Sequence, residues 1–373
     1  MAVKPKKPSK TFPLFPHANG QWARKILGKV HYFGKWKDID AALQRYRREH
    51  PHLFAGAEPP ITNGTVASVV KTFLETKAAA VETGDLAQRS YDEYEKTCNI
   101  VGATLGRSKP VSEISREDLV RLRLQLVKGQ KGKVRKPTSQ KRYIGMARVL
   151  FNFISEELGQ SIHYRKVLKM PPAKSLRAAR NEVGEKLFTA AEINALIANA
   201  KPQLKAMILL GINCGFGNQD CSTLPIEQVD IAGGWHRYWR PKTQIARRCT
   251  LWPETTAALY AVIKDRTEGL VFVTKYGNPW EGKGRADPIS YEFRKLVNKL
   301  KMGRAGVTTF YTLRRTFETI AATTGDQVAV DFIMGHAPSS NDMAAVYRQR
   351  TFDSQLQRIV ERVHGWLAGS TQL

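Results

Sequence analysis

The sequence is short of acidic residues. Asp and Glu number 33 against 59 Lys and Arg, so the 373-residue chain has a formal net charge of +26 and a pI near 10. The basic excess runs through the whole chain rather than gathering in one tail. Such a chain repels itself unless a polyanion neutralises it, and nucleic acid is the most economical partner. An anionic membrane surface is the alternative.

The sequence also lacks a long apolar run, a basic amphipathic anchor and a signal peptide. It therefore predicts a cytoplasmic, nucleoid-associated protein that does not use a membrane. The four cysteines, Cys98, Cys214, Cys221 and Cys249, show no metal-type spacing and are expected to be reduced thiols. No cluster of Asp and Glu marks a metal site, which disfavours a metal-dependent nuclease. We expect neither a metal nor another cofactor.

The length of the chain and the positions of its proline-rich breaks predict three domains. The chain is long enough for two domains or three small ones, and 42% hydrophobic residues can supply their cores. Residues 1–60 begin as a Pro- and Lys-rich arm and continue as a predicted hairpin and helix. Pro51, Pro59 and Pro60 indicate a linker after this small basic domain.

Residues 62–170 have the pattern of a helical module. Apolar stripes predict four helices, with Ser115 capping the third and residues 137–159 forming the fourth. A basic, glycine-broken loop precedes the fourth helix. The residues expected to contact DNA here are Lys131, Lys133, Arg135, Lys136, Lys141, Arg142 and Arg148. Any small helical bundle has a similar pattern, so the pattern alone does not establish DNA binding. Pro171, Pro172 and the basic run 174–180 indicate a second linker.

The third predicted domain, residues 180–373, mixes helices with short strands. Thr189 is expected to cap one helix, and an apolar helix should end at Cys214. Segments 235–239 and 249–252 predict two strands around a basic tip, and residues 271–273 predict another strand. The expected fold class is mainly α with small β-sheets (α+β).

One stretch near the C-terminus carries reactive residues in a set order. Tyr311 and Arg314 begin it, Gly335-His336 follows a predicted helix end, and Tyr347 closes it. Arg314 is expected beside the buried face of its helix, at the rim of a pocket. The order resembles the tyrosine recombinase, or phage integrase, family, whose pattern is His-x-x-Arg, Leu-Gly-His and a nucleophilic tyrosine. Tyr311 stands where that family has its first histidine, and the gap to Tyr347 is slightly longer than usual.

The resemblance covers the other two domains as well. The basic four-helix module resembles the family's core-binding domain, and the N-terminal sheet and helix resemble the arm-binding domain of some integrases. The resemblance implies a catalytic integrase domain at residues 180–373. It also implies double-stranded DNA as partner and a homo-tetramer on paired DNA sites. The apolar stripe at residues 356–363 predicts a tail helix, which could dock on a neighbouring subunit or on its own domain.

One family residue is missing. Family members usually read Gly-x-Arg-x-x-Glu where this chain has residues 215–220, which places Gly217 at the arginine and Asp220 at the acid. Glycine has no charge to offer. Asn218, Gln219 or a nearby arginine could fill part of that role. The nearby arginines are Arg240, Arg247 and Arg248, and the last two are also expected to contact DNA.

The resemblance implies metal-free attack on a phosphodiester. Arg314 would clamp two phosphate oxygens with its planar fork, and Tyr347 would attack phosphorus. Lys242, which matches a lysine on the family's β-hairpin, would protonate the leaving 5′-oxygen. His336 and Tyr311 would bind the phosphate or assist proton transfer. Two interpretations remain: a site-specific recombinase or integrase with a 3′-phosphotyrosyl intermediate, and a catalytically impaired DNA-binding protein with the same fold.

Overall fold

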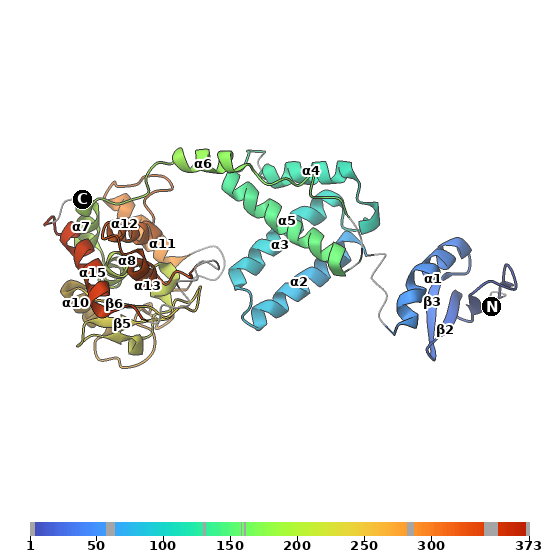
Figure 1. The fold of residues 1–373 in the computed structure, drawn as a ribbon, viewed down its shortest axis with the longest axis horizontal. Coiled ribbons are helices and arrows are strands. Elements are labelled where there is room, and N and C mark those ends of the chain that lie inside the picture. The colour runs from blue at the N-terminus through green and yellow to red at the C-terminus, as the bar shows by residue number, and fades with distance from the viewer. Residues whose placement is uncertain are drawn as a thin grey trace. The chain divides into compact units, whose positions relative to one another are not determined.

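The chain forms two compact units, residues 1–179 and 180–373, in a computed structural model (Figure 1). The structure describes residues 4–56, 64–129, 132–157, 159, 162–281, 287–338 and 350–370. It is mainly helical with two three-stranded sheets, which confirms the predicted fold class. Two separate apolar cores lie in the first unit and one lies in the second. The exact limits of the three expected domains stay a prediction, and Pro59 and Pro60 fall outside the described residues.

The N-terminal core lies between a small sheet and one helix. Strands β1 (Phe15–His17), β2 (Gln21–Ile26) and β3 (Lys29–Lys35) are antiparallel, and helix α1 (Ile39–Phe54) packs on them. Leu27 and Gly28 join β2 to β3 with φ of 49° and 84°, the left-handed pair that a tight hairpin turn needs. Trp22 is fully buried and donates its indole N–H to the carbonyl of Trp36, 3.2 Å away. The predicted hairpin and helix are confirmed.

The second core is a helical bundle. It contains α2 (Val66–Glu82), α3 (Gln88–Leu105), a short 3₁₀ turn at Val111–Glu113, α4 (Arg116–Val127) and α5 (Pro137–Glu157). Ser115 caps α4 as predicted, because its hydroxyl accepts from the backbone N–H of Asp118 at 3.2 Å. The Asp118 carboxylate is buried and pairs with both Lys109 and Arg121. The bundle therefore has the four helices expected from the apolar stripes.

The second predicted linker is helical. Residues Ala173–Asn181 form α6, which begins directly after Pro172 and contains no buried residue. Its basic composition suggests an extended segment, but Ala, Leu, Arg and Lys are all strong helix formers and the prolines precede the helix rather than interrupt it. The chain therefore passes from one unit to the next through an exposed helix.

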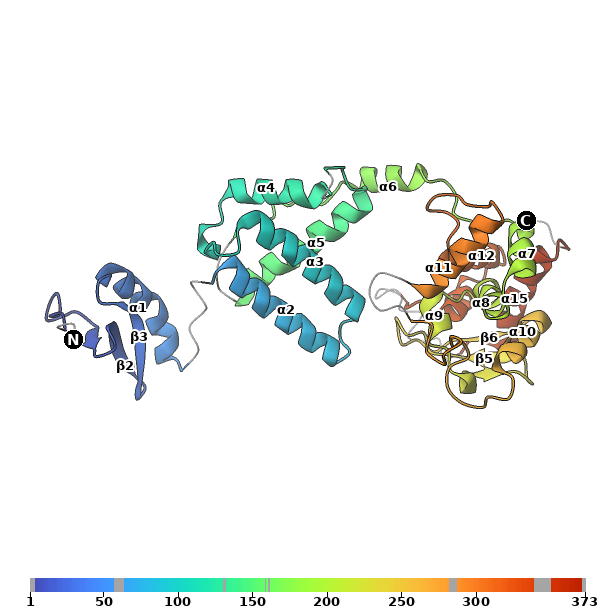
Figure 2. The ribbon, with the colours of Figure 1, turned by 180° about the vertical axis from the view of Figure 1, so that it is seen from behind.

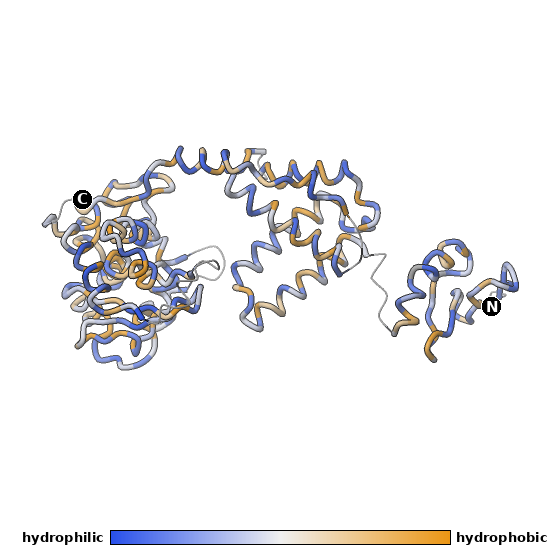
Figure 3. Tube along the Cα trace, in the orientation of Figure 1, coloured by the Kyte–Doolittle hydropathy of each residue, from blue (hydrophilic) through white to orange (hydrophobic). Residues whose placement is uncertain are grey.

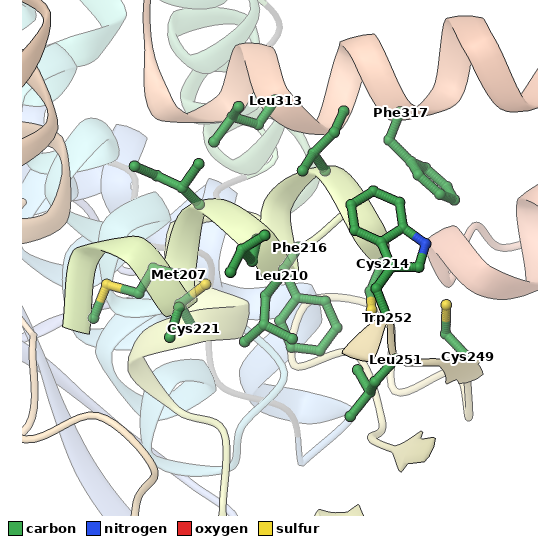
Figure 4. Packing of buried hydrophobic residues seen from close by; sticks show 14 of the residues in the cluster. Met207, Leu210, Cys214, Phe216, Cys221, Cys249, Leu251, Trp252, Leu313 and Phe317 are labelled. Carbon is green, nitrogen blue, oxygen red and sulfur yellow. The ribbon is translucent and has the colours of Figure 1, made fainter. Parts of the chain in front are cut away.

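The second unit is built around one apolar helix. Helix α8 (Pro202–Asn213) contacts α7 (Ala190–Asn199), α10 (Pro253–Ile263), α11 (Pro288–Lys299), α12 (Phe310–Ala322) and α15 (Asp353–Leu367) (Figure 2). Hydrophobic segments gather around α8 in the middle of the unit (Figure 3). Leu313 and Phe317 of α12 point toward α8 (Figure 4). A side chain at Gly211 would place its Cβ 3.0 Å from Leu313, so glycine lets the two helices approach closely. The capping of α7 by Thr189 is also confirmed.

A small sheet lies beside these helices. Strands β4 (Val229–Asp230), β5 (Trp235–Arg237) and β6 (Arg248–Thr250) are antiparallel in that order, which confirms the two strands around the basic tip. The predicted strand at residues 271–273 is wrong. Val271 and Phe272 are buried, but only isolated bridges from Leu270 and Val273 pair this segment with other chain. A short buried apolar run fits a loop under a helical layer as well as it fits a strand.

The tail helix packs on its own unit. Helix α15 buries Leu356, Ile359, Val360 and Val363 against α7, α12 and α13 (Gln327–Met334). Gln355 anchors the first turn of α15, because its side-chain amide donates to the Asp326 carboxylate at 3.0 Å. The intramolecular alternative is therefore the one that the structure shows, and docking of these apolar residues in trans would require α15 to leave its core.

Replacing Ile359 by Asp should unfold the second unit. Ile359 is fully buried, so the change removes packing and buries an unpaired carboxylate. We expect a loss of at least about 4 kcal/mol in urea denaturation. Gln357→Asp adds the same charge to an exposed position of the same helix and should cost under about 0.5 kcal/mol. Equal stability of both variants would contradict the intramolecular packing of α15.

Candidate active site

Arg314 lies at the centre of the second unit. It is 1% exposed, so it is buried rather than placed at a pocket rim as expected. One terminal nitrogen, Nη1, donates to the carbonyl of Gly215, and Nη2 donates to the carbonyl of Met334 at 2.6 Å. Burial is the main cause that lowers the pKa of Arg314 to about 10, and the charge of Arg240 is the next. The guanidinium thus joins the end of α8 to the end of α13.

A glycine turn after α13 brings a second group to Arg314. Gly335 ends the helix with φ of 62° and ψ of 41°, the left-handed cap expected from the sequence. The turn presents His336, whose Nε2 lies 3.2 Å from Nη2 of Arg314 and whose Nδ1 lies 3.0 Å from Asp331. Arginine can only donate, so Nε2 accepts and a neutral His336 carries its proton on Nδ1, toward the carboxylate.

The position of the missing arginine is filled by backbone and a carboxylate. Gly217 precedes the short helix α9 (Asn218–Ser222), and its N–H donates to the Asp220 carboxylate at 2.6 Å. Asp220 also lies 2.8 Å from Nη2 of Arg247 and 4.0 Å from Nη1 of Arg314. The side chain of Arg247 is fully buried against Phe216 and Tyr238, with its guanidinium carbon 4.2 Å and 5.2 Å from the two ring centres. Asp220 therefore pairs with a cation from the segment directly before β6 rather than with one from its own helix.

The segment between β5 and β6 is attached to the same glycine turn. Arg240 is 9% exposed and donates from Nη1 to the carbonyl of Gly335 at 3.2 Å. Thr243 donates its hydroxyl to the same carbonyl at 3.0 Å. Lys242 lies between these two anchors and is exposed. The structure thus fixes the base of the tip, while the Lys242 side chain is exposed.

The other predicted site residues divide into near and distant groups. The ring of Tyr311 lies 3.6 Å from the place where a Cβ on Gly217 would stand, and the residue is 42% exposed. Asn218 donates to Ser290 at 2.9 Å, and Gln219 is exposed. Arg248 pairs with Asp353 and stacks on Trp235 at 3.8 Å, so it serves the contact between β6 and α15. Tyr347 lies outside the described residues.

Comparison with known proteins places this site in a family. Residues 186–353 match the family model described as the phage integrase family. The second unit therefore carries a domain of the phage integrase family. Sequence comparison with curated proteins finds no significant match.

Solved integrases share the fold. A lambda integrase dimer bound to a COC′ core site has a TM-score of 0.56 at 16% identity, over 94% of this chain and 98% of that one. A lambda integrase tetramer bound to a Holliday junction has a TM-score of 0.56 at 15% identity, over 92% and 98%. The Tn1549 transposon integrase in complex with a circular intermediate DNA has a TM-score of 0.56 at 17% identity, over 80% and 99%.

The helical module presents some, but not all, of the basic residues expected at DNA. Lys133, Lys136 and Lys141 are exposed. Arg135 instead donates to the carbonyls of Gln125 and Leu126 at 2.7 and 3.0 Å, and so caps the end of α4. The remaining predicted contacts are Arg142, which is exposed and pairs with Glu93 at 3.4 Å, the half-buried Arg148, and Lys131, which lies outside the described residues.

Within the described residues, one group could reach a metal ion. Cys214, His236 and Cys249 are buried with ligand atoms within 4.8 Å of one another. Their separation along the chain hid this group from spacing rules, because three different elements supply it. Burial holds the pKa of the Cys214 thiol well above its usual value, which disfavours the thiolate that a metal would need. All four cysteines are free thiols, as expected. None of the described helices combines the length and apolarity needed to cross a membrane.

A methyl group added at Gly335 should destabilise the second unit by more than the positive φ of this residue alone explains. Its Cβ would lie 3.0 Å from both Cβ and Cδ of Arg240. Gly325 is the matched control, since it has φ of 77° and nothing within 4 Å of a Cβ. We expect Gly325→Ala to cost about 1–2 kcal/mol in urea unfolding, and Gly335→Ala at least about 1 kcal/mol more. Equal costs would show that Arg240 moves aside freely.

Proposed function

We propose that the chain is a site-specific DNA recombinase that cuts and rejoins strands through a covalent bond to Tyr347. The observation that carries the proposal is the buried Arg314, which is held beside His336 in the unit that matches the integrase family. Nη1 and Nη2 of Arg314 donate to backbone carbonyls, whereas its Nε has no hydrogen-bond partner among the described residues. An oxygen of a DNA phosphate is a suitable acceptor for such donors.

The proposed cleavage conserves charge and atoms. The Tyr347 oxygen forms a bond to phosphorus while the bond from phosphorus to the 5′-oxygen breaks. The phenol proton passes to Nε2 of His336, which must first release its hydrogen bond from Arg314, and the exposed Lys242 ammonium gives a proton to the departing 5′-oxygen. The products are a 3′-phosphotyrosyl bond and a 5′-hydroxyl. Rejoining is the reverse, with a 5′-hydroxyl of another strand as the nucleophile.

The proposed substrate is double-stranded DNA held at paired sites. The similar lambda integrase structures contain DNA, one as a dimer on a core site and one as a tetramer on a Holliday junction. The charge of +26 and the exposed lysines of the helical module suit phosphate contacts. We propose the same multimeric arrangement here. Because α15 buries its apolar face in its own unit, the subunit contacts would have to use other surfaces.

The second candidate is a DNA-binding protein with little cleavage activity. Gly217 favours it, because one lost transition-state donor costs on the order of 10²–10³ in rate. The two candidates predict the same DNA binding and differ only in covalent chemistry. Trapping a covalent adduct therefore decides between them.

Tyr347→Phe should abolish covalent trapping while preserving DNA binding, because only the nucleophilic oxygen is removed. The substrate is a pool of nicked suicide duplexes with a randomised core, and the adduct is read on a denaturing gel. Arg314→Lys keeps a charge but loses the planar fork, and should slow adduct formation about 10²-fold or more. A wild-type chain that binds the pool but gives no adduct would replace the enzyme with the DNA-binding candidate.

DNA affinity should fall steeply with salt, since phosphate contacts release counterions. Changing the exposed Lys136 and Lys141 to Gln should reduce the slope of log K against log[salt] by about one for each phosphate that is no longer neutralised. Arg135→Gln should mainly lower stability, because Arg135 caps α4. An unchanged slope in the lysine variants would remove these two residues from the interface.

A further inference from the structure

Among the described residues, the active site holds more buried positive charge than its acidic partners neutralise. Arg240, Arg247 and Arg314 are 9%, 2% and 1% exposed, and they lie close enough that the charges of Arg240 and Arg247 both lower the pKa of Arg314. Among the described residues, Asp220 is the one carboxylate that forms an ion pair with any of them. Buried charges are ordinarily paired, so this excess indicates a place for an anion.

Unsatisfied donors point the same way. In the described part of the chain, Nε of Arg314 and Nη1 of Arg247 are buried without a hydrogen-bond acceptor. Leaving such a group unpaired costs free energy in a folded protein, unless a ligand completes it. His336 does not satisfy these donors, because the lone pair of its Nε2 already accepts from Nη2 of Arg314.

The three arginines are not equivalent in what they can touch. Arg247 has a fully buried side chain, lies against Phe216, and donates from Nε to the carbonyl of Tyr238 at 3.2 Å. It is a positioning residue that holds Asp220. Arg240 is partly accessible to solvent, and its Nη1 donates to the carbonyl of Gly335. The preceding residue, Met334, accepts from Arg314. Arg240 and Arg314 are therefore anchored on adjacent residues of one turn.

We propose that Arg240 is the second guanidinium on the scissile phosphate, in place of the arginine that the family carries at the position of Gly217. Asp220 and Arg247 support it by keeping the pocket charged and ordered. Arg248, the other nearby arginine, is committed to Asp353 and Trp235. The inference rests on the proposed recombinase function, and it assigns a catalytic contact to a residue outside the family's pattern.

Removing the guanidinium at residue 240 and then placing one at residue 217 tests the proposal directly. Arg240→Met should lower the rate of adduct formation on the suicide duplexes about 10²–10³-fold, with DNA affinity within about threefold. Adding Gly217→Arg to that variant should restore at least about tenfold of the loss. The backbone at Gly217 suits any residue, since its φ is −100°, and the nearest neighbours of a Cβ would be the Asp220 carboxylate at 3.3 Å, which would have to shift by a few tenths of an ångström, and the Tyr311 ring at 3.6 Å. Arg237→Met is the matched control at an exposed site on β5 and should leave the rate unchanged.

A second measurement separates this inference from the proposed function. Inorganic phosphate, compared with chloride at equal ionic strength, should raise the melting temperature of the wild type and Arg237→Met by about 2–4 °C. Arg240→Met should lose most of that rise. If the wild type gives no adduct but this difference remains, recombination fails and the anion site stands. A full cleavage rate in Arg240→Met, or an equal phosphate effect in all three proteins, would overturn the assignment of Arg240.

Discussion

The second unit depends on the pair of hydrogen bonds from Arg314 to the carbonyls of Gly215 and Met334. These bonds satisfy two chain ends that the helices leave open, and they do so with a charge that the core would otherwise exclude. Gly215 has φ of 64°, and a Cβ there would lie 2.5 Å from the sulfur of Met334. The buried charge, the two left-handed glycines and the crossing of α8 with α12 are therefore one arrangement, and each part constrains the others.

Much of this fold follows from local chemistry that can be read in the sequence. The caps at Ser115 and Thr189, the apolar stripes of α8 and α12, and the glycine turn before His336 act over a few residues, so their pattern determines their structure. The prediction of a strand at residues 271–273 is wrong because a short, continuous apolar run does not distinguish a strand from a buried loop. The composition of the segment after Pro172 indicates that it is exposed, but it does not show whether an exposed segment is helical. The structure forms helix α6 there.

The site is only partly predictable for a different reason. Arg314 and His336 can be found from order and spacing, whereas the convergence of Arg240, Arg247 and Asp220 requires contacts between residues far apart in the chain. Spacing likewise gives no reason to separate Arg247 from Arg248, although Arg247, directly before β6, is buried and Arg248, the first residue of β6, pairs with Asp353. Arg135 shows the same limit, because its sequence context is basic while its hydrogen bonds are those of a cap.

The attachment of the 240–243 turn to one carbonyl has a kinetic consequence. Arg240 and Thr243 both hold Gly335, and Lys242 projects between them. On the proposed assignment, the phosphate clamp and the proton donor belong to one short segment with one docking point. Releasing that point would withdraw both together, so a subunit would switch between fully competent and silent without passing through a half-active form.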